Sequence, residues 1–213
     1  MPNLHIISGS NGAGKSSVGP SYLPENIQNS CSVFDGDKLF MQRRKALWDA
    51  GSRAIKEIKK IANMEVAEMF DNLVDESIKQ NADFVYEGHF TNDATWDIPK
   101  RFKECGYSIH MIFFGLRDTD LSQLRVVNRV REGGHYVDPA HLASNFYGNL
   151  EKLNINYEIF DSIQIVDTSE TEPKVLCLLE NNIIVSSVSY SELPEWFKNY
   201  LPLLANRISN YLP

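Results

Sequence analysis

The stretch Gly9-Ser10-Asn11-Gly12-Ala13-Gly14-Lys15-Ser16 decides the fold. It matches the pattern G-x-x-x-x-G-K-[ST] of a phosphate-binding loop, whose glycines let the backbone curl until successive N–H groups point at phosphate oxygens. The apolar run Leu4-His5-Ile6-Ile7 before it has the length of a strand, and Ser17-Val18-Gly19 continues toward a helix until Pro20. A strand, a glycine-rich loop and a helix start in this order predict a site for a nucleoside triphosphate.

Two side chains of this P-loop have predicted roles. The ammonium group of Lys15 is expected to reach the β- and γ-phosphates, and the hydroxyl of Ser16 is expected to ligate Mg²⁺. ATP and Mg²⁺ are therefore the expected cofactors. The residues predicted to contact the nucleotide are Gly9, Ser10, Asn11, Gly12, Ala13, Gly14, Lys15, Ser16 and Ser17.

Composition argues against several classes of protein. A net charge of −7 disfavours non-specific binding of nucleic acid, which needs a surplus of lysine and arginine. The basic clusters at 43–45 and 56–60 are interpreted as solvated helix faces. The three cysteines form no C-x-x-C pair, which suits a reducing cytoplasm and predicts no zinc site. No run approaches the roughly twenty apolar residues that cross a bilayer, and the P-loop begins too near Met1 for a signal peptide. We therefore expect a cytoplasmic protein.

Strand and helix patterns alternate after the P-loop. Strands are predicted at 30–34, 83–86, 108–114 and 163–166, and helices at 93–105, 118–131 and 139–160. The apolar spacing from about 51 to 80 predicts one long helix or a broken pair. Pro99 predicts a late start or a kink of its helix. The buried side of the helix at 118–131 is predicted to consist of Leu121, Leu124, Val127 and Val130.

The last forty residues have a different pattern. Two apolar runs, 175–179 and 183–188, flank Glu180-Asn181-Asn182 and predict a hairpin, and 193–208 predicts one amphipathic helix. The sequence therefore predicts an α/β fold of the P-loop NTPase type, with three layers and a mostly parallel central sheet. We expect a single domain over 1–213, with a core at about 1–170 and a hairpin and helix at about 171–213.

Three features favour a small-molecule kinase over other P-loop proteins. The run Ile109–Phe114, which reads as the central strand, ends in Gly115 and places no acid there, although motors and ABC-type ATPases need one. No guanine-reading N-K-x-D motif occurs. Two acids at strand ends, Asp37 and Glu87, fall where an acceptor could lie against the γ-phosphate.

These acids suit the activation of an alcohol. A carboxylate within hydrogen-bond reach orients a hydroxyl and accepts its proton as the new bond forms, and Asp37 is the predicted base. Asp35 is the alternative active acid, and either residue could instead cap the helix that begins near Lys38. Glu87 is predicted to bind acceptor hydroxyls, and its alternative role is a pair with a nearby lysine.

A basic helix supplies candidate phosphate clamps. Phosphoryl transfer needs positive charge on the transferring oxygens, often from an element that closes over ATP. The helix that ends in Arg129 and Arg131, followed by the hinge Gly133-Gly134, suits such a lid. Arg129 and Arg131 are therefore predicted to clamp the phosphate, and His135 is assigned a role in folding the lid. An exposed basic face is the alternative.

Four stretches together resemble the zeta toxin family: the P-loop, Phe34-Asp35-Gly36-Asp37, Tyr86-Glu87-Gly88-His89-Phe90-Thr91 and the run from Arg125 to Val137. The resemblance covers about residues 3–169. These proteins are P-loop kinases related to toxins that phosphorylate a hydroxyl of UDP-N-acetylglucosamine. The chain departs from the pattern at Ala143–Asn149, which contains no arginine where relatives often carry an arginine-rich helix, and Lys152 is the candidate substitute.

The resemblance implies roles for particular residues. It implies that Lys15 and Ser16 hold ATP·Mg²⁺ and that Asp37 is the catalytic base. Glu87 and Thr91 would contact the acceptor sugar nucleotide, and Asp35 is grouped with them as substrate-binding. Arg129 and Arg131 would stabilise the transferring phosphate.

The leading prediction is an ATP-dependent kinase for a hydroxyl of a nucleotide sugar, acting as a toxin or as a housekeeping enzyme. An antitoxin protein is a possible partner, and neither nucleic acid nor a membrane is expected. The alternatives are a polynucleotide or RNA kinase, which would need a basic groove, and an ATP-binding regulatory module in which catalysis has decayed.

Overall fold

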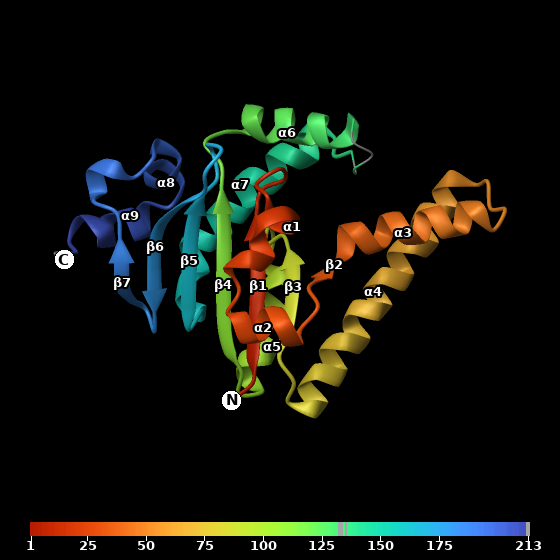
Figure 1. Ribbon diagram of the computed structural model, residues 1–213, viewed down its shortest axis with the longest axis horizontal. Coiled ribbons are helices and arrows are strands. Elements are labelled where there is room, and N and C mark those ends of the chain that lie inside the picture. Colours follow the sequence, from red (N-terminus) through yellow and green to blue (C-terminus); the bar gives the residue numbers. More distant parts are fainter. Residues whose placement is uncertain (132–133, 135, 212–213) are drawn as a thin grey trace.

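The computed structural model describes residues 1–131, 134 and 136–211. These residues form a seven-stranded sheet in the order β2-β3-β1-β4-β5-β6-β7 (Figure 1). The strands are β1 (Asn3–Gly9), β2 (Phe34–Asp35), β3 (Phe84–Gly88), β4 (Ser108–Gly115), β5 (Ser162–Asp167), β6 (Lys174–Glu180) and β7 (Ile183–Ser187). The first five are parallel, and β6 and β7 join antiparallel. The predicted α/β class with a mostly parallel sheet is confirmed.

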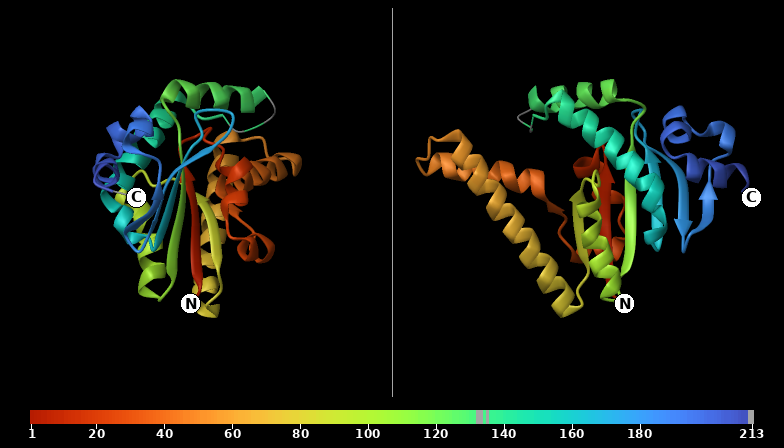
Figure 2. Two further views of the ribbon diagram at one scale, coloured as in Figure 1. Left: turned by 60° about the vertical axis from the view of Figure 1, so that its left-hand side comes forward. Right: turned by 180° about the vertical axis from the view of Figure 1, so that it is seen from behind.

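Helices cover both faces of the sheet. They are α1 (Lys15–Val18), α2 (Glu25–Ser30), α3 (Gly36–Asp49), α4 (Ile55–Gln80), α5 (Asp97–Glu104), α6 (Thr119–Arg131), α7 (Pro139–Asn156), α8 (Glu195–Tyr200) and α9 (Pro202–Ser209). Figure 2 shows α5 and α7 on one face and α1 and α2 on the other. None of the helices formed by the described residues is long and apolar enough to cross a membrane.

The core lies around β1 and β4. Leu4, Ile6 and Ile7 of β1 and Ile109 and Phe114 of β4 are buried. Near-continuous apolar sequence of this kind is what a parallel strand needs when helices cover both of its faces. Since β1 is central and the P-loop follows it directly, the loop emerges at the carboxyl edge of the sheet, where ligands bind in open α/β folds.

Helices α3 and α4 form an arm that projects away from the sheet (Figure 1). The prediction of one long helix is confirmed for α4, which buries Ile58, Ala62 and Val74. The arm is anchored to the sheet through Phe70 of α4, whose ring packs against the ring of Tyr86. No residue of α3, all of which the structure describes, is fully buried.

Two predicted elements have different bounds in the structure. The strand predicted at 30–34 is reduced to Phe34–Asp35, because Ser30 still belongs to α2. The predicted helix at 193–208 is two helices, α8 and α9, which meet at Leu201. Pro202 causes this break, since a proline has no N–H to continue the first helix but suits the first turn of the second. The expectation of a late start near Pro99 is confirmed, as α5 begins at Asp97 after a 3₁₀ turn.

The buried side predicted for α6 is wrong in part, because Leu121 packs against the core but two of the four predicted residues are exposed. Leu124 is 57% exposed and Val127 is 38% exposed, whereas Ser122 and Val126 are buried. The reason is that this face of α6 packs on the polar P-loop, where the Ser122 hydroxyl donates to the carbonyl of Asn11 at 2.6 Å. The contact face of α6 therefore includes a buried serine and leaves two of its apolar side chains exposed.

Candidate functional site

The backbone of the P-loop depends on glycine. Gly9, Gly12 and Gly14 have φ angles of +137°, +75° and +89°. Residues with a Cβ rarely adopt backbone conformations in this region. At Gly9 a Cβ would also lie 2.2 Å from the carbonyl oxygen of Phe114 on β4. The loop can therefore leave β1 in this direction only with glycine at position 9.

Three side chains from distant segments hold the loop in shape. The Ser122 hydroxyl donates to the carbonyl of Asn11, and the Thr168 hydroxyl, at the end of β5, donates to that of Ala13 at 3.0 Å. The guanidinium of Arg125 donates to the carbonyl of Gly12 at 3.4 Å and also to the carbonyls of residues 169 and 170. The roles of Ser122 and Thr168 were missed because nothing near either residue in sequence marks it as a P-loop contact.

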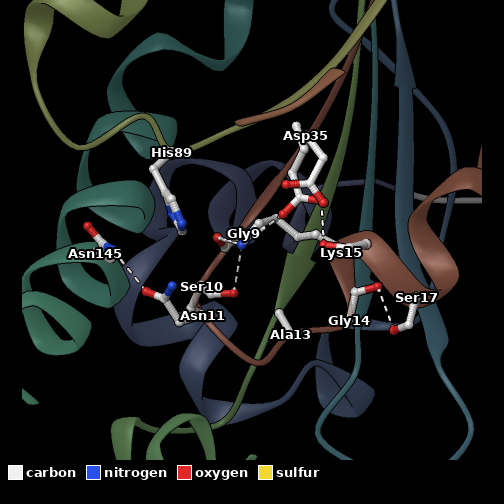
Figure 3. Close-up of polar contacts among 12 residues, drawn as sticks. Gly9, Ser10, Asn11, Ala13, Gly14, Lys15, Ser17, Asp35, His89 and Asn145 are labelled. Atoms are coloured by element: carbon white, nitrogen blue, oxygen red, sulfur yellow. Dashed lines mark hydrogen bonds and ion pairs between the residues drawn. The ribbon is translucent and has the colours of Figure 1, made fainter. Parts of the chain in front are cut away.

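Lys15 lies inside the loop and is only 7% exposed. Its amino group donates to the carbonyls of Gly9 and Ser10 at 2.9 and 3.0 Å (Figure 3). A carboxylate oxygen of Glu87 lies 3.9 Å from the same amino group. Burial lowers the pKa of Lys15, and the Glu87 carboxylate opposes that shift. The lysine that pairs with Glu87 is therefore Lys15 itself.

Glu87 also contacts the predicted metal ligand. The Ser16 hydroxyl donates to Glu87 Oε2 at 2.7 Å. Burial raises the pKa of Glu87, while Lys15 and the hydrogen bond from Ser16 act in the opposite direction. A half-buried carboxylate beside a buried lysine is a pattern that active sites share with structural ion pairs.

The register of β2 against β3 places Asp35 directly beside Glu87. Asp35 Oδ1 accepts from the backbone N–H of Lys38 at 2.9 Å, so this residue caps α3, one of the alternatives left open by the sequence. Asp37 lies in the first turn of α3 and is exposed. Its charge opposes the lowering of the Lys15 pKa by burial and adds to the raising of the Glu87 pKa by burial. The two predicted acids at the end of β2 therefore lie within electrostatic range of the P-loop lysine, but neither is among the described residues that line the cavity at the P-loop.

A cavity of about 180 Å³ opens at the P-loop. Arg129 is one of its lining residues, and Arg131, exposed in the last turn of α6, is not among the lining residues that the structure describes. Gly134 packs on Arg129, since a Cβ at Gly134 would lie 2.5 Å from Arg129 Cγ. The lining residues are Gly12, Gly14, Lys15, Ser16, Ser17, Glu87, Arg125 and Arg129. Gly133 and His135, assigned to a lid, lie outside the described residues.

The loop after β3 carries Thr91 and is held by α7. Gly148 lets the helix come close, because a Cβ there would lie 3.0 Å from the Cβ of Thr91. Lys152, the candidate substitute for the missing arginines, pairs with Asp93 at 2.6 Å. The side chain of Asn145 instead reaches the P-loop, where it donates to Asn11 Oδ1 at 2.9 Å (Figure 3). The contact between α7 and the P-loop is therefore made by the side-chain amide of Asn145.

The end of β4 offers no room for an acid. A Cβ at Gly115 would lie 2.1 Å from the indole ring of Trp196 of α8. The cavity lining instead combines three cationic side chains, those of Lys15, Arg125 and Arg129, with one carboxylate, Glu87. A surplus of positive charge around a glycine-rich loop at a helix start suits a polyphosphate chain.

Comparison with known proteins agrees with this geometry. The zeta toxin family model matches residues 1–175. A protein of Haemophilus influenzae, described as uncharacterized, is 28% identical over 134 residues, which are 61% of this chain and 81% of that protein.

Solved structures share the fold. The structure of the PezAT chromosomal toxin–antitoxin system of Streptococcus pneumoniae matches with a TM-score of 0.63 at 19% identity, over 99% of this chain and 86% of that one. The AvrRxo1-ORF1:ORF2 complex with ATP matches with a TM-score of 0.70 at 14% identity, over 94% of this chain. Our chain spans 64% of the length of that AvrRxo1 chain. With its P-loop geometry and a family match over most of its length, the chain belongs to the zeta toxin family.

Proposed function

We propose that the chain is an ATP-dependent kinase that transfers the γ-phosphate to a hydroxyl of a nucleotide sugar similar to UDP-N-acetylglucosamine. The observation that carries this proposal is the pairing of β2 with β3, which sets the start of α3, with the exposed Asp37, beside Glu87, the carboxylate that lines the P-loop cavity with Lys15. A phosphate-binding cation and a carboxylate open to an acceptor are the two groups that transfer to an alcohol needs.

The P-loop residues 9–17 would hold the triphosphate. Lys15 would exchange its bonds to the carbonyls of Gly9 and Ser10 for bonds to the β- and γ-phosphates. The Ser16 hydroxyl, now bonded to Glu87, is the group that would ligate Mg²⁺. When bound, the ion would supply positive charge to the β- and γ-oxygens. Arg129 supports the proposed phosphate clamp from within the cavity lining, whereas Arg131 has support from the sequence alone.

Asp37 would act on the acceptor. As the acceptor oxygen bonds to the γ-phosphorus, the bond between that phosphorus and the β–γ bridging oxygen breaks and ADP leaves. The proton of the hydroxyl passes to the Asp37 carboxylate. Glu87, Asp35 and Thr91 would contact the acceptor, and the register that sets Asp35 beside Glu87 supports a common role for these two acids.

The family supports the class of acceptor and a protein partner. The resemblance to zeta toxins implies a hydroxyl of UDP-N-acetylglucosamine as the class of acceptor. The similar PezAT structure is that of a toxin–antitoxin system. We include a restraining antitoxin in the proposal. If the chain is a toxin, coexpression of such a partner should restore the growth of cells that express it.

The kinase proposal is tested with a metabolite extract and with UDP-N-acetylglucosamine. Each is incubated with the protein and ATP·Mg²⁺ and examined by mass spectrometry for a gain of one phosphate. Asp37→Asn should lower the transfer rate by about 10² to 10⁴, the usual share of a general base. The matched control is Asp49→Asn at the far end of α3, where the carboxylate pairs with Lys45. Equal rates for the wild-type protein and Asp37→Asn would remove Asp37 as the base.

A further inference from the structure

We infer that His89 serves as an uncharged hydrogen-bond donor to the terminal phosphate, and that Asn149 of α7 fixes its ring in the form with the proton on Nε2. This inference rests on the proposed kinase function and adds two residues to its site. His89 lies on the loop after β3, and Figure 3 shows its ring directed toward the start of the P-loop at Gly9 and Ser10.

The orientation of the Asn149 amide follows from two backbone partners. Asn149 is 1% exposed. Its Oδ1 accepts from the backbone N–H of Phe90 at 2.5 Å, and its Nδ2 donates to the backbone carbonyl of Asn145 at 2.6 Å. A backbone N–H can only donate and a backbone carbonyl can only accept, so the amide oxygen and nitrogen cannot be exchanged.

The fixed amide determines the state of the imidazole. Asn149 Nδ2 lies 3.0 Å from His89 Nδ1. Because the amide nitrogen is a donor, His89 Nδ1 must be an acceptor without a proton, and in a neutral ring Nε2 then carries the proton. A protonated ring would set two N–H donors against each other. Burial lowers the pKa of His89 well below its usual value, and the charges of Lys15 and Arg129 lower it further.

The helix is built to approach this loop. Gly148, the neighbour of Asn149, has no side chain where a Cβ would press on Thr91. A glycine inside a helix weakens it, so its place here is explained by close contact. Asn145, one turn before Asn149, donates its side-chain amide to Asn11 of the P-loop. One helix face therefore joins the phosphate loop to the loop that carries His89.

A neutral donor suits this position. The ring points toward the start of the P-loop (Figure 3), and burial followed by the charges of Lys15 and Arg129 lowers its pKa. An N–H group that is already oriented can stabilise developing negative charge without reorganisation. By contacting the phosphate, His89 would be a catalytic residue. Asn149 acts only through His89 and is a positioning residue.

The ring can be examined by nitrogen NMR of the imidazole, independently of catalysis. In the free wild-type protein at pH 7 we expect a neutral His89 with its proton on Nε2. Addition of AMP-PNP with Mg²⁺ should shift the Nε2–H resonance. A positively charged ring, or a neutral ring with its proton on Nδ1, would overturn the inference. So would an Nε2–H resonance that does not shift when AMP-PNP binds.

Variants extend the test to turnover. His89→Phe should lower kcat by about 10²-fold with little change in the KM for ATP, as expected for one lost donor to the transition state. His89→Gln, which keeps an N–H donor, should recover part of that loss. Asn149→Asp should move the proton to Nδ1, whereas the control Asn156→Asp, on the same helix with the same bond to a carbonyl four residues back, should not.

The two proposals fail in different ways. An unchanged kcat in His89→Phe would overturn the catalytic role of the ring. If the wild-type protein transfers phosphate to no acceptor but AMP-PNP shifts the Nε2–H resonance, the kinase proposal fails while the donor contact stands.

Discussion

The P-loop, the proposed phosphate side of the site, and the start of α3, the proposed acceptor side, are built differently. On the phosphate side, Asn11 and Lys15 are buried, and side chains from α6, α7 and the end of β5 bond to the P-loop. On the acceptor side, Asp35 and Asp37 lie at the start of α3, a helix with no fully buried residue among its described positions. The arm of α3 and α4 leads away from the sheet (Figure 1).

We interpret this difference as one between two tasks, the binding of a triphosphate, which is constant, and the binding of an acceptor, which varies among kinases. In the proposed reaction the triphosphate would be the same in every turnover, so amides and cations held in place before binding would avoid reorganisation when charge develops. The acceptor differs among kinases, and few buried contacts leave its side of the cleft open to adjustment. We therefore expect substitutions at the P-loop to cost far more stability than comparable ones on the arm.

Glycine substitutions should give the largest difference in the free energy of unfolding between the P-loop and the arm. Gly9→Ala would combine a φ of +137° with a contact of 2.2 Å to the carbonyl of Phe114, so we expect a loss of about 3 kcal/mol or more. Gly51→Ala on the arm shares a positive φ of +100°, but none of the described residues places an atom within 4 Å of its Cβ. Its cost should stay near 1–2 kcal/mol. Urea unfolding of both variants checks the ratio, and equal losses would contradict it.

Acidic pH should destabilise the sheet below the P-loop. His5 of β1 stacks on His110 at 4.7 Å. Burial, and then His110, lowers the pKa of His5 to about 4. Because the unfolded chain binds the proton more readily, stability is full above about pH 6.5 and falls toward pH 4, by up to about 3 kcal/mol.

The acid response can be assigned by substitution. His5→Gln should reduce the fall in the free energy of unfolding between pH 6.5 and 4, and the part that remains is expected from His89 and His110, whose pKa values burial also lowers. The free energies come from urea unfolding at several pH values. If His5→Gln retains the whole slope, another group carries the acid response.

The smallest effect is expected on the arm. Trp48 is 46% exposed, and its ring packs against the guanidinium of Arg53 at 4.6 Å. Trp48→Ala should cost less than about 1 kcal/mol, the range of surface substitutions and exposed cation–π contacts. Trp48→Phe, which keeps an aromatic face, should cost still less. Thermal unfolding measures both, and a loss of several kcal/mol in Trp48→Ala would mean that the arm is part of the cooperative core.

Local sequence patterns predicted the P-loop and the strand ends that carry the acidic residues of the candidate site. The P-loop and its preceding strand are adjacent in sequence, and the acids at 35, 37 and 87 follow strand patterns, so parallel order brings them to one edge. The break at Pro202 was also readable, since proline favours a helix start, although the apolar spacing from 193 to 208 predicted one helix. The buried face of α6 was not readable, because apolar spacing cannot show that a helix packs on a polar loop.

By itself, the sequence determined that the chain is an α/β protein with a P-loop, because strand periodicity and loop chemistry are properties of neighbouring residues. Only the tertiary structure decided which side chains complete the site. Thr168 lies 155 residues from Ala13, and Asn145 lies 134 residues from Asn11. A hydrogen bond over such a separation exists only after the strands and helices have packed. No local pattern could therefore distinguish these amides and hydroxyls from others in the chain.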